Sequence, residues 1–324
     1  MNKVGWIILI VCLSLLLCLC FGILLGRRMT SNLYVDQDTV NTKEYKDLKN
    51  SYSADGIYSI QADNLKELTI DWIGGSVIVE LTDNDILQIR ETSSTTISEK
   101  YALRYGVSGG KLRIQACQKN FIGKLPKKDL VVSLPCSLSD ALHECKIDTV
   151  SASIAAEGLR LDELEVNTVS GKVELSGMIA EEAGIDTVSG PVFLLDSQAK
   201  SLRIDSVSGK IKVNGDVKKI KTSSVSGPIE CNLDGCKEIR ANSVSGEVAL
   251  ILTKTPKTLK VDTTSGEVRI ALPSDASCAI HMDTMSGKLY LNDEAVGAKQ
   301  LTLGEGTAEF DIDTMSGNVF IRTK

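Results

Sequence analysis

The sequence predicts an all-β fold: a parallel β-solenoid of about nine 19-residue rungs, with a right-handed β-helix favoured. Two observations predict the rungs. A Thr/Ser-Val-Ser-Gly motif or a close variant recurs nine times, and apolar residues alternate with period 2 on both sides of it. A third observation, a long uncharged apolar stretch near the start, predicts one transmembrane helix. The expected order is a membrane anchor at 1–28, a polar stalk at 29–56, a β-rich N-terminal cap at 57–140 and the solenoid repeat domain at 141–324.

The anchor is predicted from the stretch between Val4 and Leu25. At about 1.5 Å per residue, a helix of this length crosses a hydrocarbon core about 30 Å thick. A cleaved signal peptide is the alternative, but it needs a shorter apolar region and a small-residue cleavage site, whereas this segment ends in Arg27 and Arg28. Lys3 and the α-amino group on the other side leave the orientation nearly balanced under the positive-inside rule.

The stalk and the cap follow. Residues 29–56 are polar and lack sustained periodicity, as expected of a spacer. In the cap, two degenerate repeats are expected, with corners at Gly75 and Gly110, together with strands at 86–90 and 130–134. Terminal repeats of a solenoid depart from the consensus because they close an open end.

The solenoid is defined by its repeat spacing, with the last residue of each motif taken as position 0. The first motif ends at Ala152, and the spacing stays nearly constant until a much longer last step, from Gly287 to Gly317. Positions −5, +2 and +4 are mostly Val, Ile or Leu, so they are expected to face inward on two short strands joined at a corner. A unit this short buries its apolar face only by stacking on its neighbours, at about 4.8 Å per rung. The long last step holds LTLGEGTAEFDID, which is expected to form a hairpin that shields the last edge.

The corner glycines are the residues that we assign a structural role. Glycine permits positive φ at a corner and a close approach of neighbouring rungs, and the serines beside it are expected to bond from rung to rung. Every rung carries the Ser-Gly pair, which favours structure over a single active site. The assigned corner residues are Gly171, Gly190, Gly209, Gly227, Gly246, Gly266, Gly287 and Gly317.

Position −4 carries a row of Asp, Asn and Ser side chains that are expected to point outward. Such a row could collect Ca²⁺. Position −6 on the same face is largely basic, however, and this favours a solvated ladder of opposite charges over a metal site. We therefore predict no metal and no cofactor.

The remaining composition excludes several function classes. After residue 28 the chain has 33 basic and 42 acidic residues, so a nucleic-acid partner is not expected. Only His143 and His281 are present, which disfavours histidine catalysis. Ser197-Gln-Ala-Lys200 matches an SxxK motif without its SDN and KTG partners, so no catalytic residue is assigned. Cys231 and Cys236 flank one bend, and the sequence leaves open whether they pair.

The repeat I/V-D-T/S-V-S-G-x-V-x-L and the closing GEGTAEFDIDTMSGNVFI resemble a bacterial adhesin-like family of β-strand-repeat proteins of unknown function. The resemblance covers roughly residues 57–324. It implies a solenoid displayed outside the cytoplasmic membrane behind a membrane anchor, with some members acting as accessory proteins of envelope-stress operons. It implies no catalytic residues.

Three functions follow as hypotheses. The first is a non-enzymatic, single-pass membrane protein whose extracytoplasmic solenoid binds a protein or an envelope polymer. The second is a self-assembling structural β-helix, which the cap and the closing segment disfavour. The third is a glycan-active β-helix enzyme, but the repeat spacing is nearly constant along most of the solenoid, which leaves no room for loops to wall a cleft.

Overall fold

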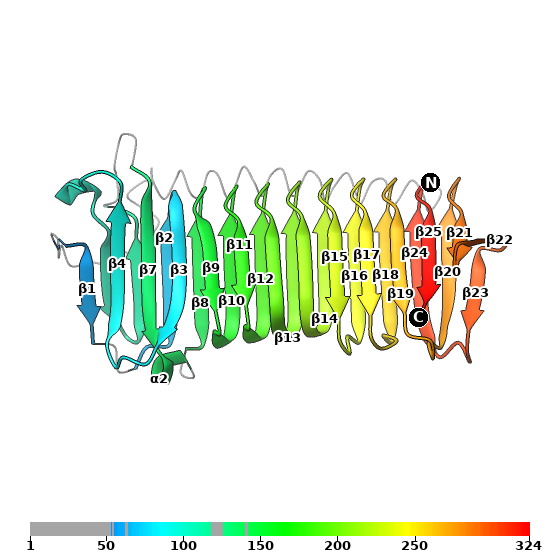
Figure 1. Ribbon diagram of the computed structural model, residues 1–324, viewed down its shortest axis with the longest axis horizontal. Helices are drawn as coiled ribbons and strands as arrows, with labels where there is room; N and C mark the ends of the chain where they lie inside the picture. The colour runs from blue at the N-terminus through cyan, green and yellow to red at the C-terminus, as the bar shows by residue number, and fades with distance from the viewer. Residues whose placement is uncertain (1–52, 54, 62–63, 118–125, 140–141) are drawn as a thin grey trace. The chain divides into compact units, whose positions relative to one another are not determined.

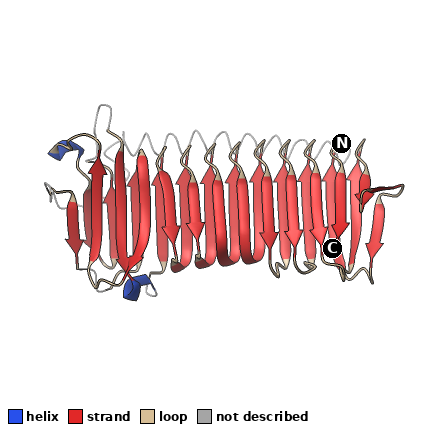
Figure 2. Ribbon diagram, in the orientation of Figure 1, coloured by secondary structure: helices blue, strands red, loops and turns tan. Residues whose placement is uncertain are grey.

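The computed structural model describes residues 53, 55–61, 64–117, 126–139 and 142–324. Within these ranges the regular structure is almost entirely β-strand, as Figure 2 shows; the exceptions are η1 (Glu99–Tyr101) and α2 (Cys136–Ser139). The predicted all-β class is confirmed. The predicted anchor and nearly all of the stalk lie outside the described residues. Among the residues described, no helix is long and apolar enough to span a bilayer.

The chain divides into two compact units, one ending at Glu182 and the other beginning at Ala183, inside strand β12 (Ile179–Thr187). The first unit contains β1 (Ile57–Ile60), β2 (Glu67–Trp72), β3 (Gly75–Thr82), β4 (Leu87–Ser93), β5 (Arg104–Ser108), β6 (Lys111–Gln115), β7 (Lys128–Pro135), β8 (Glu144–Thr149), β9 (Ser153–Glu157), β10 (Arg160–Thr168) and β11 (Val173–Ser176).

The second unit contains β13 (Val192–Ser206), β14 (Ile211–Ser224), β15 (Ile229–Leu233), β16 (Glu238–Ser243), β17 (Val248–Leu252), β18 (Thr258–Thr263), β19 (Val268–Leu272), β20 (Cys278–Thr284), β21 (Leu289–Leu291), β22 (Glu294–Val296), β23 (Gln300–Leu303), β24 (Ala308–Thr314) and β25 (Val319–Thr323).

Strands of successive repeats pair in parallel at equal repeat positions. In the first unit β8 pairs with β10, and β9 pairs with β11. In the second unit β14, β16 and β18 pair in turn on one side of the corner, and β15, β17 and β19 pair in turn on the other. Each residue therefore lies beside its counterpart one repeat away, which is the solenoid-like stacking that the period predicts.

The core is made of the inward positions of these strands. The side chains at −5, +2 and +4 alternate with exposed ones and are nearly all less than 4% exposed, as in Ile204, Ile211 and Val213. Burying one Val, Leu or Ile side chain contributes about 1.5–3 kcal/mol. Because every repeat supplies several such residues, apolar burial in continuous rows stabilises the stack.

The repeats do not stack in chain order at the C-terminal end. β24 pairs with β18 on one edge and with β20 on the other, and β25 pairs likewise with β19 and β21. The red β24 and β25 accordingly lie between these strands in Figure 1. Stacking in sequence order, which the regular steps favour, is wrong here.

This insertion protects the end of the stack. The last repeat is paired on both edges, while short antiparallel strands cover the outer repeat, β23 on β20 and β22 on β21. An uncovered parallel edge would offer unpaired backbone groups to other chains. The closing segment is not the expected hairpin, because its two strands lie on opposite edges of β20. β23 shields the outer edge, as expected, whereas β24 lies between β18 and β20.

The cap, within the first unit, uses the same kind of insertion. β2 pairs with both β6 and β8, and β3 pairs with both β7 and β9, so the repeat that turns at Gly75 lies inside the stack. Gly110 was expected to be a solenoid corner, and this prediction is wrong. β5 and β6 form an antiparallel hairpin, and Gly109 and Gly110 lie in its turn with φ of +60° and +81°. The strands predicted at 86–90 and 130–134 are present as β4 and β7.

A buried ion pair joins β4 to β7 inside the cap. The Lys128 ammonium is 2% exposed and contacts the Glu91 carboxylate, and it donates a hydrogen bond to the carbonyl oxygen of Tyr101 at 2.5 Å. The same ammonium lies 4.9 Å from the centroid of the Trp72 ring. Burial lowers the pKa of Lys128, and the charge of Glu91 opposes that shift. The cap is therefore fastened by a polar cluster, which the apolar pattern does not predict.

Candidate functional site

The corner glycines lie where neighbouring repeats come closest. A Cβ built on Gly209 would lie 2.8 Å from the carbonyl carbon of Gly190, and closer still to its oxygen. The same clash with the adjacent corner is found at Gly171, Gly227, Gly246, Gly266, Gly287 and Gly317. The residues with positive φ do not include any of these corners, so the expectation of left-handed backbone is wrong. Glycine is required there because a carbonyl oxygen occupies the space of the side chain.

Hydroxyl groups at position −3 hydrogen-bond to most of the corner residues from inside, whereas that of Ser224, beside Gly227, is buried without a partner. The backbone N–H of Gly266 donates to the Thr263 hydroxyl at 3.0 Å, and the N–H of Gly190 donates to the Thr187 hydroxyl at the same distance. Both threonines are buried. At such corners the threonine supplies the acceptor that a backbone donor needs. The hydroxyls of Ser206 and Ser243 instead donate to the carbonyl oxygens of Gly209 and Gly246.

The serines at position −1 bond to backbone instead of to one another. The hydroxyl of Ser208 donates to the carbonyl oxygen of Val188 at 3.4 Å, and that of Ser245 donates to Val225 at 3.4 Å. These long bonds on an exposed edge contribute little. The expected contact between repeats is present, but it runs from hydroxyl to carbonyl.

Charges at positions −4 and −6 alternate along one outer face. Arg203 pairs with both Asp186 and Asp205, and Lys260 lies 3.4 Å from Asp262 and 3.6 Å from Asp313. These pairs match the ladder of opposite charges that the sequence favours over a Ca²⁺ site. Among the described residues, no group of three metal-ligating side chains gathers.

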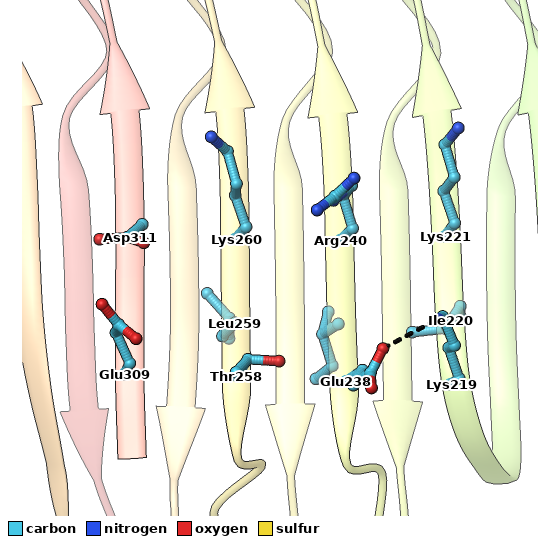
Figure 3. A pocket seen from close by; sticks show the side chains of 11 residues that line it. Lys219, Ile220, Lys221, Glu238, Arg240, Thr258, Leu259, Lys260, Glu309 and Asp311 are labelled. Carbon is cyan, nitrogen blue, oxygen red and sulfur yellow. Dashed lines mark ion pairs between the residues drawn. The ribbon is translucent and has the colours of Figure 1, made fainter.

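A groove of about 310 Å³ crosses this face in the second unit, over β14, β16, β18 and β24. One wall is the row at position −6, which runs Lys221, Arg240, Lys260 and Asp311; the other is the row at position −8, which runs Lys219, Glu238, Thr258 and Glu309 (Figure 3). The other lining residues, Ile220, Ile239 and Leu259, are inward and buried, so the sheet itself forms the floor.

The two ends of this groove differ in charge. Lys219 and Glu238 form an ion pair at 2.9 Å, which holds the pKa of Glu238 below its usual value. Lys221 and Arg240, by contrast, form no ion pair within the described part of the chain. At the β24 end, neither Glu309 nor Asp311 has a cationic partner within 4.0 Å among the described residues. The groove is thus cationic at one end and anionic at the other.

The six cysteines after residue 28 are free thiols. Burial raises the pKa of Cys231 to about 12 and that of Cys236 to about 11. The pairing of these two, which the sequence leaves open, is absent from the structure. Protonated buried thiols of this kind act as small apolar groups.

The fold and these surfaces define a repeat protein. Side chains at the same repeat position on successive strands form a row across an outer face. Residues 65–322 match the Toastrack DUF4097 family, a domain of unknown function, and the chain belongs to this family. The resemblance to an adhesin-like repeat family is thereby confirmed. No curated protein matches the chain.

Solved structures of low identity are similar to the chain. A "putative lipid binding protein" from Parabacteroides distasonis is 18% identical with a TM-score of 0.51, over 83% of this chain and 96% of that one. A "putative cell adhesion protein" from Clostridium sporogenes is 12% identical with a TM-score of 0.30, over 83% of this chain and 98% of that one. A "putative adhesin" from Bacteroides fragilis is 12% identical with a TM-score of 0.40, over 83% of this chain and 96% of that one. Of these three, only the Parabacteroides structure has a TM-score above 0.5, and at 18% identity its likeness supports the fold alone.

Sequence reasoning missed the groove. Its basic end is visible in the sequence as consecutive basic residues at position −6. Its acidic end is not, because Glu309 and Asp311 reach β18 only through the insertion of the last repeat. The long final step, from Gly287 to Gly317, is the one signal that this repeat is connected differently.

Proposed function

We propose that this protein is a non-enzymatic binding protein, anchored in the membrane by residues 1–28, whose extracytoplasmic solenoid presents an outer face to a partner at the cell envelope, with an accessory role in envelope stress. In this proposal the stacked repeats form a right-handed β-helix, since the sequence lacks the hexapeptide period of left-handed forms. The partner is a protein or an envelope polymer.

One observation carries the binding proposal. The outer face over β14, β16, β18 and β24 presents one side chain per strand in continuous rows, and these rows line a groove of about 310 Å³. Strands about 4.8 Å apart make such rows a regular array of contact points for an extended partner.

The cell-adhesion and lipid-binding descriptions of the structural neighbours belong to those proteins. At 12–18% identity neither description selects a ligand for this chain.

Two measurements separate this proposal from the alternatives. Sedimentation of the full-length chain in detergent is expected to give one small species at every concentration, because antiparallel strands cover the outer repeat of the second unit. Growth into filaments would support a self-assembling structural role instead. Incubation with isolated cell-wall glycan is expected to release no soluble sugar, and release would support a glycan-active enzyme.

A further inference from the structure

We propose that the groove over β14, β16, β18 and β24 binds an extended peptide segment with segregated charges, acidic at one end and basic at the other. The inference deepens the proposed binding function by naming the chemistry of the partner, and it rests on that function. The acidic part would lie against Lys221 and Arg240, and the basic part against Glu309 and Asp311.

The charges that carry this proposal have no ion-pair partners among the described residues. Lys221 and Arg240 are exposed neighbours on adjacent strands, and like charges placed opposite each other on a sheet repel. Glu309 and Asp311 stand two positions apart on β24 and repel in the same way. On β18, between the cationic pair and the anionic pair, Lys260 forms ion pairs with Asp262 and Asp313, and Thr258 is neutral. A ligand with two oppositely charged ends relieves both repulsions.

The length of the ligand follows from the strand spacing. The anionic strand β24 lies two strands from β16 and three from β14. At about 4.8 Å per strand, the centre of the cationic pair is about 12 Å from the anionic pair. An extended peptide rises about 3.3 Å per residue, so charges four residues apart span about 13 Å. A peptide is preferred over a glycan because none of the lining residues is aromatic, so no ring is available for a sugar to stack on.

The insertion of the last repeat creates this arrangement. If β20 followed β18 in the stack, Ala279 and His281 would take the places of Glu309 and Asp311. The groove would then be cationic along most of its length and would suit a simple anion. Residues from the final repeat therefore decide which ligand fits.

The test is a calorimetric titration of the full-length chain in detergent, at low salt, with acetyl-Asp-Asp-Gly-Ser-Lys-Lys-amide. The matched peptide acetyl-Asp-Lys-Gly-Ser-Asp-Lys-amide has the same composition without segregated charges. We expect it to bind about fivefold or more weakly, and we expect salt to weaken binding of the first peptide because the charges are exposed.

Charge reversal separates binding from folding. The double variant Lys221→Glu with Arg240→Glu should bind the charge-segregated peptide about fivefold or more weakly. Adding Glu309→Lys and Asp311→Lys inverts the groove, which then accepts the peptide in the opposite direction and restores binding. Lys212→Glu with Lys288→Glu makes the same change in net charge outside the groove and should have no effect.

Equal binding of both peptides, an unaffected double variant, or no rescue by inversion would overturn the proposal. So would a zwitterionic polysaccharide that binds the groove when the peptide does not. None of these readouts depends on which side of the membrane the solenoid occupies. A failed titration and a failed membrane assignment are therefore distinguishable.

Discussion

The close contact at the corners predicts a large effect from one methyl group. In Gly209→Ala the new Cβ would meet the Gly190 carbonyl, with its carbon at 2.8 Å, whereas carbon atoms in contact normally lie about 3.5–4.0 Å apart. The two repeats must separate by roughly 1 Å at this point. That movement strains the flanking bonds from Ser208 N–H to Val188 and from Val192 N–H to Lys210, which are 2.9 and 2.8 Å long.

Loss or weakening of these two backbone bonds, with the accompanying loss of packing, is expected to cost about 2–4 kcal/mol. Urea unfolding followed by circular dichroism should show a clearly lower midpoint, and Gly209→Val should lower it further. Gly297→Ala is the matched control, because no atom lies within 4 Å of a Cβ at Gly297. If Gly209→Ala unfolds at the same urea concentration as Gly297→Ala, the assigned contact between corners is wrong.

Three further predictions concern polar groups that are buried or half-buried. Thr263→Val removes the acceptor of the Gly266 N–H and should cost about 1–3 kcal/mol, with Thr263→Ser closer to the wild type; equal midpoints for the Val and Ser variants in urea would contradict this. Lys128→Met leaves the Glu91 carboxylate buried without its cation and should cost about 3–5 kcal/mol, partly recovered by adding Glu91→Gln; no recovery would argue against a role for the charge. Burial raises the pKa of Asp262, so its contribution to stability is present below the pKa of the unfolded state and is lost as pH rises through the folded value. Asp262→Asn should therefore raise the thermal midpoint at pH 7 and have no effect near pH 3, and an equal shift at both would be inconsistent with titration of this group.

The repeat period made the stacked strands predictable, because buried and exposed positions must alternate in every copy. Residues such as Ile204 and Val213 could be placed inside the core from the pattern alone. The order of the repeats could not. The last two repeats carry Met282 and Ile312 at position −5 and Leu289 and Val319 at position +2, and either order preserves the apolar rows.

Local ambiguity explains the other differences. The same sequence pattern, alternating apolar residues followed by a glycine, fits both a solenoid corner, as at Gly75, and a hairpin turn, as at Gly110. Only the pairing partners distinguish them. The buried pair of Lys128 and Glu91 was unpredictable for a related reason, since two charges far apart in the sequence give no periodic signal.

The orientation of the solenoid is the central claim of the proposed function, and thiol labelling in intact cells tests it most directly. Cys136 is exposed, whereas the other five cysteines after residue 28 are buried, so Cys136→Ser gives a background with low reactivity. Lys212→Cys then places one thiol on an exposed face, and lysed cells provide the maximum signal.

An extracytoplasmic solenoid predicts that an impermeant maleimide labels Lys212→Cys equally in intact and lysed cells, and that the background strain shows little labelling in either. Labelling that appears only after lysis would place the repeats on the cytoplasmic side and contradict the proposal that they bind a partner at the envelope.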